Sequence, residues 1–304
     1  MEYVLRTNAL TKKYKKFEAL KGLSMNVPKG SIYGFVGRNG AGKTTLFRII
    51  CGLQFSTSGE FELFGTNSND AGILKARNRM GAIVEAPSLF PEMTARENLE
   101  HQYKLLGMPN YDGISELLSL VGLENTQNKK TKNFSLGMRQ RLGIAVALCG
   151  NQDFLMLDEP INGLDPQGII EMRELILKLN REKGITFLIS SHILDELAKL
   201  ATHYGFIDSG KMVREMSADE IEDACHKSLK VNVSSTALLA GVLDKMGLEY
   251  KILNDNDANI YSRPNISELV MALDKEGCKL NSCSEQEETL EGFFISLVGG
   301  GSNV

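Results

Sequence analysis

Apolar residues near the start of the chain change from an alternating to a continuous pattern. Residues Glu2–Leu10 and Leu20–Val27 alternate with a period of two, which predicts strands with one buried face. Pro28-Lys29-Gly30 marks a turn, and the apolar run Ile32–Val36 then predicts a fully buried strand. Between Leu46 and Leu53 the apolar residues recur at the spacing of one helix face. The predicted order is strand, glycine-rich loop, helix.

Helical periodicity dominates residues 91–148. Thr94 is placed to cap a helix that runs through Leu106, and further helices are predicted over Ile114–Val121 and Leu136–Leu148. Short apolar runs of the buried-strand type return at Phe154–Leu157 and Thr186–Ile189, separated by an amphipathic stretch over residues 168–180. That order predicts a βαβ unit.

The pattern changes again after the predicted hairpin Phe206–Val213, whose Asp-Ser-Gly segment forms the turn. The order βαββαβ that follows is that of a ferredoxin-like unit. Its predicted elements are strand Leu229–Val233, helix Thr236–Met246, strands Tyr250–Leu253 and Asn259–Ser262, helix Asn265–Lys275 and strand Cys278–Ser282, with a last helix over Glu285–Leu297. We therefore predict an α/β domain over residues 1–216, with a helical part at about 88–150, and a small α+β domain over residues 217–304.

Composition narrows the class of protein. Of the 304 residues, 42% are apolar and 24% charged, which suits a globular chain of roughly two domains. A net charge of −4 provides no overall basic field, so we expect no nucleic-acid partner. No apolar run approaches the ~18–20 residues of a membrane span, and residues 1–6 lack the pattern of a signal peptide. We expect a cytoplasmic chain whose five cysteines are reduced structural thiols.

The segment between the buried strand and the first helix carries the chemistry of a phosphate-binding loop. Residues 37–44 match GxxxxGK[ST] in the strand-to-helix context that this motif requires. Backbone N–H groups of such a loop and the positive end of the helix attract phosphates. The alternative is a glycine-rich turn with a solvated lysine. The predicted nucleotide ligands are Gly37, Arg38, Asn39, Gly40, Ala41, Gly42, Lys43, Thr44 and Thr45, with Lys43 on the β/γ oxygens and Thr44 on Mg²⁺.

Two carboxylates follow the apolar run Phe154–Leu157. In an α/β sheet, Asp158 and Glu159 would stand beyond the carboxyl edge, where ligands bind. One of them can hold the metal, and the other can orient and deprotonate a water molecule. Alone, an Asp-Glu-Pro segment is more often a turn. Downstream of a phosphate loop, the functional interpretation is favoured.

Together with these motifs, three more segments resemble the ATP-binding subunits of ABC transporters. Residues 134–141, FSLGMRQR, resemble the ABC signature, residues 163–166 resemble the D-loop, and Ser190-Ser191-His192 resembles the segment with the switch histidine. Tyr14 occupies the position of the aromatic residue that stacks on adenine. The resemblance covers residues 1–216 and implies a P-loop NTPase fold, with ATP and Mg²⁺ as cofactors.

The resemblance also implies a role for each matching residue. Tyr14 would stack on the base, Asp158 would hold Mg²⁺ with Thr44, Glu159 would polarise the attacking water and His192 would contact the γ-phosphate. From the residues alone, Tyr14 could be an ordinary strand residue and His192 a structural one.

Three residues of the resemblance point to a dimer. Ser135 and Gly137 would be presented to the γ-phosphate held by a second copy or a closely related subunit, and Asp165 would lie at the interface between the two. Ser135 also suits the N-cap of the helix that follows it, and Asp165 suits a turn. A cap and a phosphate contact are compatible, because a capped helix end is itself an anion site.

Some positions depart from the common family pattern. Leu136 and Met138 replace a glycine and the glutamine of the signature, and Glu85 stands where most relatives carry the Q-loop glutamine, as a further candidate Mg²⁺ ligand. With residues 288–294, these variants resemble the bacitracin-resistance and lantibiotic-immunity branch.

That branch implies a motor subunit on the inner face of the membrane, driving a separately encoded permease that exports a peptide. Leu89 and Phe90 are either permease contacts or core residues. The alternative is a soluble regulatory ABC ATPase without a permease.

Overall fold

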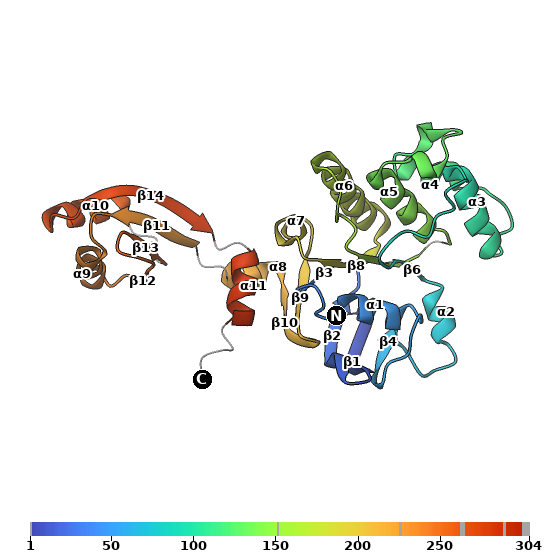
Figure 1. The fold of residues 1–304 in the computed structure, drawn as a ribbon, viewed down its shortest axis with the longest axis horizontal. Coiled ribbons are helices and arrows are strands. Elements are labelled where there is room, and N and C mark those ends of the chain that lie inside the picture. Colours follow the sequence, from blue (N-terminus) through green and yellow to red (C-terminus); the bar gives the residue numbers. More distant parts are fainter. Residues whose placement is uncertain (1, 151, 225–226, 262–264, 288–289, 300–304) are drawn as a thin grey trace. The chain divides into compact units, whose positions relative to one another are not determined.

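The structure, a computed structural model, describes residues 2–150, 152–224, 227–261, 265–287 and 290–299. Two compact units divide the chain between Ala218 and Asp219, close to the predicted boundary. The first unit is centred on a six-stranded sheet (Figure 1). In spatial order its strands are β10 (Lys211–Ser217), β9 (His203–Asp208), β3 (Ile32–Val36), β8 (Thr186–Ser191), β7 (Phe154–Asp158) and β6 (Met80–Ile83).

The strands β9, β3, β8, β7 and β6 run parallel, and β10 pairs antiparallel with β9 as the predicted hairpin. The pairs Val36 with Ser191 and Asp158 with Ser190 place the carboxyl ends of β3, β8 and β7 side by side. Segments that follow these three strands therefore meet at one edge of the sheet.

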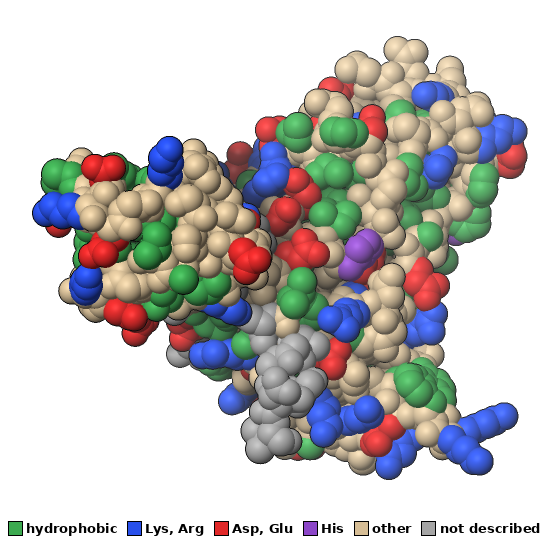
Figure 2. All heavy atoms as spheres, turned by 60° about the vertical axis from the view of Figure 1, so that its left-hand side comes forward, with side chains coloured by type: hydrophobic (Ala, Val, Ile, Leu, Met, Phe, Trp, Pro, Cys, Tyr) green, Lys and Arg blue, Asp and Glu red, His purple; other side chains and the backbone are tan. Residues whose placement is uncertain are grey.

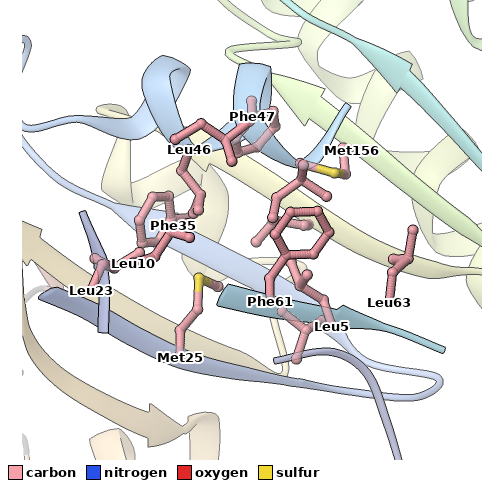
Figure 3. Close-up of a cluster of buried hydrophobic side chains, with 14 of the residues drawn as sticks. Leu5, Leu10, Leu23, Met25, Phe35, Leu46, Phe47, Phe61, Leu63 and Met156 are labelled. Carbon is pink, nitrogen blue, oxygen red and sulfur yellow. The ribbon is translucent and has the colours of Figure 1, made fainter. Parts of the chain in front are cut away.

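A second, antiparallel sheet packs below the first helix. It has the order β2 (Phe17–Pro28), β1 (Tyr3–Tyr14), β4 (Ser58–Leu63) and β5 (Thr66–Asn67). The first two strands are longer than predicted, because register shifts along β1 let the pairing continue to Tyr14. Leu46 and Phe47 of α1 (Lys43–Ile50) face side chains of this sheet such as Leu10 and Phe61 across a buried apolar core (Figure 3).

Helices form the third part of this unit, and all but the two five-residue ones were predicted. They are α2 (Ile73–Arg77), α3 (Ala95–Leu105), α4 (Ile114–Leu120), α5 (Leu136–Ala147), α6 (Pro166–Lys183) and α7 (Leu194–Ala198), with short 3₁₀ turns at Glu124–Thr126 and Thr131–Asn133. The predicted cap of α3 is present: the Thr94 hydroxyl accepts from the Glu97 N–H, and the Glu97 carboxylate accepts from the Thr94 N–H.

The second unit contains a four-stranded antiparallel sheet in the order β12 (Tyr250–Ile252), β13 (Asp257–Ile260), β11 (Lys227–Val233) and β14 (Leu280–Glu287). With α9 (Thr236–Met246) and α10 (Ile266–Lys275), this is the predicted βαββαβ arrangement. The remaining helices are α8 (Ala218–Ala224) and α11 (Leu290–Gly299).

The boundary between the last strand and the last helix of this unit was predicted wrongly. Glu285–Glu287 continue β14 because they pair with β11, so the last helix does not begin at Glu285. Residues 288 and 289 of the predicted helix, and position 262 of a predicted strand, lie outside the described residues.

The surface carries both signs of charge. On the face drawn in Figure 2, acidic side chains lie among the basic ones. None of the helices in the described ranges combines the length and the apolar content that crossing a membrane requires. Cys51, Cys149, Cys278 and Cys283 are free thiols, as predicted, while Cys225 lies outside the described residues.

Candidate functional site

The loop between β3 and α1 has the backbone of a phosphate cradle. Gly42 adopts a φ of +112°, and a Cβ atom there would stand 2.6 Å from the Ala19 carbonyl oxygen. A Cβ atom on Gly37 would stand equally close, at 2.6 Å, to the Ile207 carbonyl oxygen. Only glycine fits both positions, so the two neighbouring strands fix the course of the loop.

Lys43 lies inside this loop and is only 6% exposed. Its Nζ donates a hydrogen bond to the Gly37 carbonyl oxygen at 2.6 Å and lies 3.4 Å from Glu159 Oε1. The lysine therefore brings its charge to the inner side of the loop, between the phosphate-loop backbone and the carboxylate after β7.

Asp158 is the best-anchored side chain of the site, at 3% exposed. Its Oδ2 accepts a hydrogen bond from the Thr44 hydroxyl at 2.8 Å, and its Oδ1 accepts one from the Ser190 hydroxyl. Ser190, near the end of β8, thus helps to hold the Asp158 carboxylate in place, a contact that no sequence motif predicted. Its place follows only from the neighbouring positions of β7 and β8.

Glu159 connects the lysine to the histidine. Its Oε2 lies 2.7 Å from His192 Nδ1, and its backbone N–H donates to the Ser190 hydroxyl at 2.9 Å. The backbone φ of Glu159 is +52°, in the left-handed region that side chains other than glycine seldom adopt. The residues Lys43, Thr44, Asp158, Glu159 and His192 thus form one connected set at the carboxyl edge of the sheet.

Tyr14 stands at the end of β1 and is 40% exposed. Its hydroxyl donates to Gln54 Oε1 at 2.6 Å, and Gln54 Nε2 donates to the carbonyl oxygen of Thr45 in α1. Through Gln54, the predicted base-stacking residue is tied to the helix that carries the phosphate loop.

The signature and D-loop segments are neighbours. Ser135 caps α5 by accepting from the Met138 N–H at 3.2 Å, and Asp165 caps α6 by accepting from the Gly168 N–H at 3.1 Å. A Cβ atom built on Gly163 would meet the Leu136 side chain at 3.2 Å. In the described part of the chain, no hydrogen bond or ion pair joins Ser135 or Asp165 to Lys43 or to Glu159.

Glu85 follows β6 with a φ of +67° and forms an ion pair with Arg48 of α1. It lines a pocket of about 450 Å³ together with Glu159 and Leu136 of the signature. The pocket therefore connects the candidate Q-loop position, the carboxylate after β7 and the signature. Arg48, the partner of Glu85, gives no signal in the sequence that would have identified it.

A phosphate loop with its lysine inside, and a hydroxyl–carboxylate pair beside it, define a P-loop nucleotide-binding protein. Residues 20–162 match the ABC transporter family model. The chain is 40% identical to the bacitracin transport ATP-binding protein BcrA of Bacillus licheniformis, over 99% of both chains. It is 42% identical to the lantibiotic transport ATP-binding protein SrtF of Streptococcus pyogenes, over 72% of this chain and 93% of SrtF. The chain belongs to the ABC transporter family and is an ATP-binding ATPase subunit of it.

Solved structures agree with this family. The chain is similar to cbiO1 of Clostridium perfringens, part of an ABC transporter complex, with a TM-score of 0.65 and 28% identity over 73% of this chain and 91% of that one. It is also similar to a dimeric post-hydrolysis state of the cassette MJ0796 bound to ADP and Pi, with a TM-score of 0.63 and 27% identity over 70% of this chain and 98% of that one. The predicted ABC ATPase fold of the first unit is confirmed.

Proposed function

We propose that this chain is the motor of an exporter that moves a bacitracin-like or lantibiotic-like peptide. The support is the similarity to BcrA, which extends over 99% of both chains, whereas SrtF matches only 72% of this chain. A match that includes the second unit favours a bacitracin-like substrate over a lantibiotic.

The phosphate-loop residues suit Mg²⁺ and a triphosphate. A hydroxyl and a carboxylate oxygen 2.8 Å apart, on Thr44 and Asp158, are hard oxygen donors of the kind that Mg²⁺ binds together with phosphate oxygens. The described residues contain no group of three or more His, Cys, Asp or Glu side chains that could hold a metal ion, which suits a site that nucleotide oxygens complete. Bound Mg²⁺ would supply positive charge against the phosphates.

The observation that carries the ATPase mechanism is the contact of Glu159 with both Lys43 and His192. In our proposal Lys43 turns from Glu159 to the β/γ oxygens when a nucleotide binds. Glu159 then orients the attacking water and accepts its proton, while His192 stays beside the carboxylate and contacts the γ-phosphate.

The second half of each ATP site would come from another subunit. Ser135 is exposed at the N-terminus of the twelve-residue helix α5, whose free N–H groups favour a phosphate. Leu136 and Gly163 pack together, so the signature and Asp165 would approach the partner as one surface. The proposed dimer is a homodimer or a pair with a closely related ATPase subunit.

A groove beside the Q-loop position suits a permease segment. It has a volume of about 450 Å³ and is lined by Leu89, which lies between β6 and α3, and by residues of β6, α3 and α5, including Gln102 and Val146. Phe90 is 45% exposed next to it and contacts His101 edge-on, so it is not a core residue. We place the cytoplasmic side of a separate membrane permease here.

A glutamine in place of Glu159 tests the motor. Glu159→Gln keeps the shape of the side chain but removes the proton acceptor, so ATP hydrolysis should fall by about 10²–10⁴-fold while ATP binding persists. Phosphate release measures turnover, and size-exclusion chromatography with ATP should show a stable dimer. Lys43→Ala is the matched control and should lose ATP binding itself. Unchanged hydrolysis in Glu159→Gln would exclude Glu159 from this role.

Transport is tested separately from hydrolysis. The tagged chain should co-purify from membranes with a multi-helix partner, and expression of both should raise the bacitracin concentration that cells tolerate. The Glu159→Gln variant should co-purify equally well without raising tolerance. Purification with no membrane partner would instead favour the soluble regulatory ATPase.

A further inference from the structure

The side chain of Gln54 joins two segments that the nucleotide must contact at the same time. Its Oε1 accepts from the Tyr14 hydroxyl at 2.6 Å, and its Nε2 donates to the Thr45 carbonyl oxygen at 3.4 Å. Thr45 belongs to the first turn of α1, directly after the phosphate-loop lysine. One side chain thus sets the position of the Tyr14 ring relative to the phosphate loop.

The backbone around Gln54 holds this side chain in place. The Gln54 N–H donates to the Arg48 carbonyl oxygen at 3.3 Å, which folds the segment back on the end of α1. Three residues later, the Thr57 N–H donates to the Thr11 carbonyl oxygen at 2.7 Å, and the Lys13 N–H donates to the Thr57 hydroxyl at 2.9 Å. The segment is anchored to α1 on one side and to β1 on the other.

Lys12 lies over one face of the Tyr14 ring. Its Nζ is 5.2 Å from the ring centroid and donates to the Phe55 carbonyl oxygen at 2.6 Å. A cation at this distance is attracted to the electron-rich face of an aromatic ring. Lys12 lies over one face and Gln54 holds the hydroxyl, while 40% of Tyr14 stays exposed, so in our proposal a flat ligand stacks on the other face.

We propose that Gln54 is a positioning residue for the nucleotide base: it holds the Tyr14 ring at a fixed height and tilt relative to the phosphate loop. A ring that is already in place loses little conformational freedom when adenine stacks on it, so more of the stacking energy appears as affinity. This inference rests on the proposed role of Tyr14 as the adenine platform. It assigns ATP affinity, and not the chemical step, to Gln54.

The test compares a ligand that has a base with one that has none. Calorimetry gives the Kd of ATP and of inorganic tripolyphosphate for the full-length chain, for Gln54→Ala and for Tyr14→Phe, which removes the hydroxyl but keeps the ring. Losing the hydrogen bond in either variant should raise the Kd of ATP about 3–10-fold. The Kd of tripolyphosphate should stay within about two-fold, and KM should rise while kcat at saturating ATP is unchanged.

A double variant tests whether both substitutions break the same contact, and a control variant tests whether the effect is specific to this site. If both single variants break the same contact, Gln54→Ala with Tyr14→Phe should bind ATP no more weakly than either alone. Asn69→Ala, which removes an exposed amide after β5, should bind both ligands as the parent chain does. Equal weakening of ATP and tripolyphosphate in Gln54→Ala would mean that the residue merely supports the phosphate loop, and would overturn the proposal.

Tyr14→Ala tests the proposed adenine platform separately from the role of Gln54. It should weaken ATP binding about 5–100-fold, since stacking on an aromatic ring is lost. If Tyr14→Ala leaves ATP affinity unchanged, the proposed adenine platform itself fails. If Tyr14→Ala weakens ATP binding and Gln54→Ala does not, the platform stands and the role of Gln54 is wrong.

Discussion

At the scale of single residues, the site places its charges in pairs. Lys43 faces Glu159, and Glu85 faces Arg48. The second pair would offset the charge of a carboxylate at the candidate Q-loop position beside a bound triphosphate. Arg48 compensates its charge, although both side chains are exposed enough that the pair contributes little to the free energy of unfolding.

Removing Arg48 should therefore weaken nucleotide binding without unfolding the chain. In Arg48→Ala the Glu85 carboxylate is left uncompensated in the pocket that it shares with Glu159, and we expect the Kd of ATP to rise about 3–10-fold. Arg48→Ala with Glu85→Gln should restore the affinity, because the repelling charge is gone. Titration with a fluorescent ATP analogue measures both; equal affinities in Arg48→Ala and the double variant would contradict this account.

Two thiols, the partly buried Cys51 and the buried Cys149, give a prediction about pH. Burial raises the pKa of Cys51 to about 11 and that of Cys149 to about 12. An unfolded thiol ionises near its ordinary pKa of 9.0, whereas the folded thiols stay protonated at that pH. Below pH 9 the thiols make their full contribution to the free energy of unfolding. As the pH rises above 9, this contribution falls by about 1.4 kcal/mol per thiol for each pH unit, until the pKa of the folded thiol is reached.

Denaturant unfolding between pH 8 and 11 measures this slope. Cys149→Ala should show a shallower decline than the parent chain, whatever its stability at pH 8. An identical decline in both proteins would show that Cys149 titrates alike in the folded and unfolded states.

The sequence predicted the site residues that belong to a local motif. It did not predict the contacts that depend on the order of the strands in the sheet. Lys43, Thr44 and Asp158 follow from motifs beside buried strands. The contact of Lys43 with Glu159 requires β3 and β7 to flank β8, which no local pattern specifies. Gln54 and Arg48 act through partners 40 and 37 positions away, so their roles appear only in the folded chain.

At the scale of elements, helix α5 approaches the sheet closely because β6 has a glycine at the point of contact. A Cβ atom on Gly81 of β6 would stand 2.1 Å from the carbonyl oxygen of Ala147 in α5. Gly81→Ala should push α5 away from the sheet and lower the free energy of unfolding by about 1–3 kcal/mol. Thermal or denaturant unfolding of the first unit measures the loss, and an unchanged midpoint would refute the close approach.

The opposite result is expected for a glycine in α9. Gly241 is exposed in the middle of that helix, and a Cβ atom there meets nothing within 4 Å. Because glycine weakens a helix interior, Gly241→Ala should stabilise the second unit by up to about 1 kcal/mol. Helix content and the unfolding midpoint of that unit report the change; a lower midpoint would contradict the open surroundings.

The length of an element decided how well the sequence predicted it. The helices α3, α5 and α6 have eleven, twelve and eighteen residues and begin at side-chain caps, at Thr94, Ser135 and Asp165. Short elements were not predicted: α2 and α7 have five residues each, too few to show a helical period. The error at Glu285 arose because pairing with β11 overrides the local preference of a polar segment.

At the scale of the whole molecule, the two units have separate cores. The first unit carries the phosphate loop, the signature and the carboxylates, and SrtF matches 72% of this chain over 93% of its own length. A chain that ends at Ala218 should therefore fold, and should bind ATP within about two-fold of the full-length affinity.

Circular dichroism and ATP titration of the shortened chain check this expectation. Hydrolysis in the presence of the permease should show whether the second unit regulates the motor. A shortened chain that aggregates or fails to bind ATP would mean that the second unit is part of the ATPase fold.

The left-handed backbone of Glu159 has a consequence for protein engineering. Such a conformation is strained by about 1–3 kcal/mol for most residues and is relaxed for glycine. A library screened for heat tolerance alone would thus enrich glycine at this position and lose the carboxylate that we propose for orienting the attacking water. Thermostable variants of this ATPase should be sought with position 159 held constant.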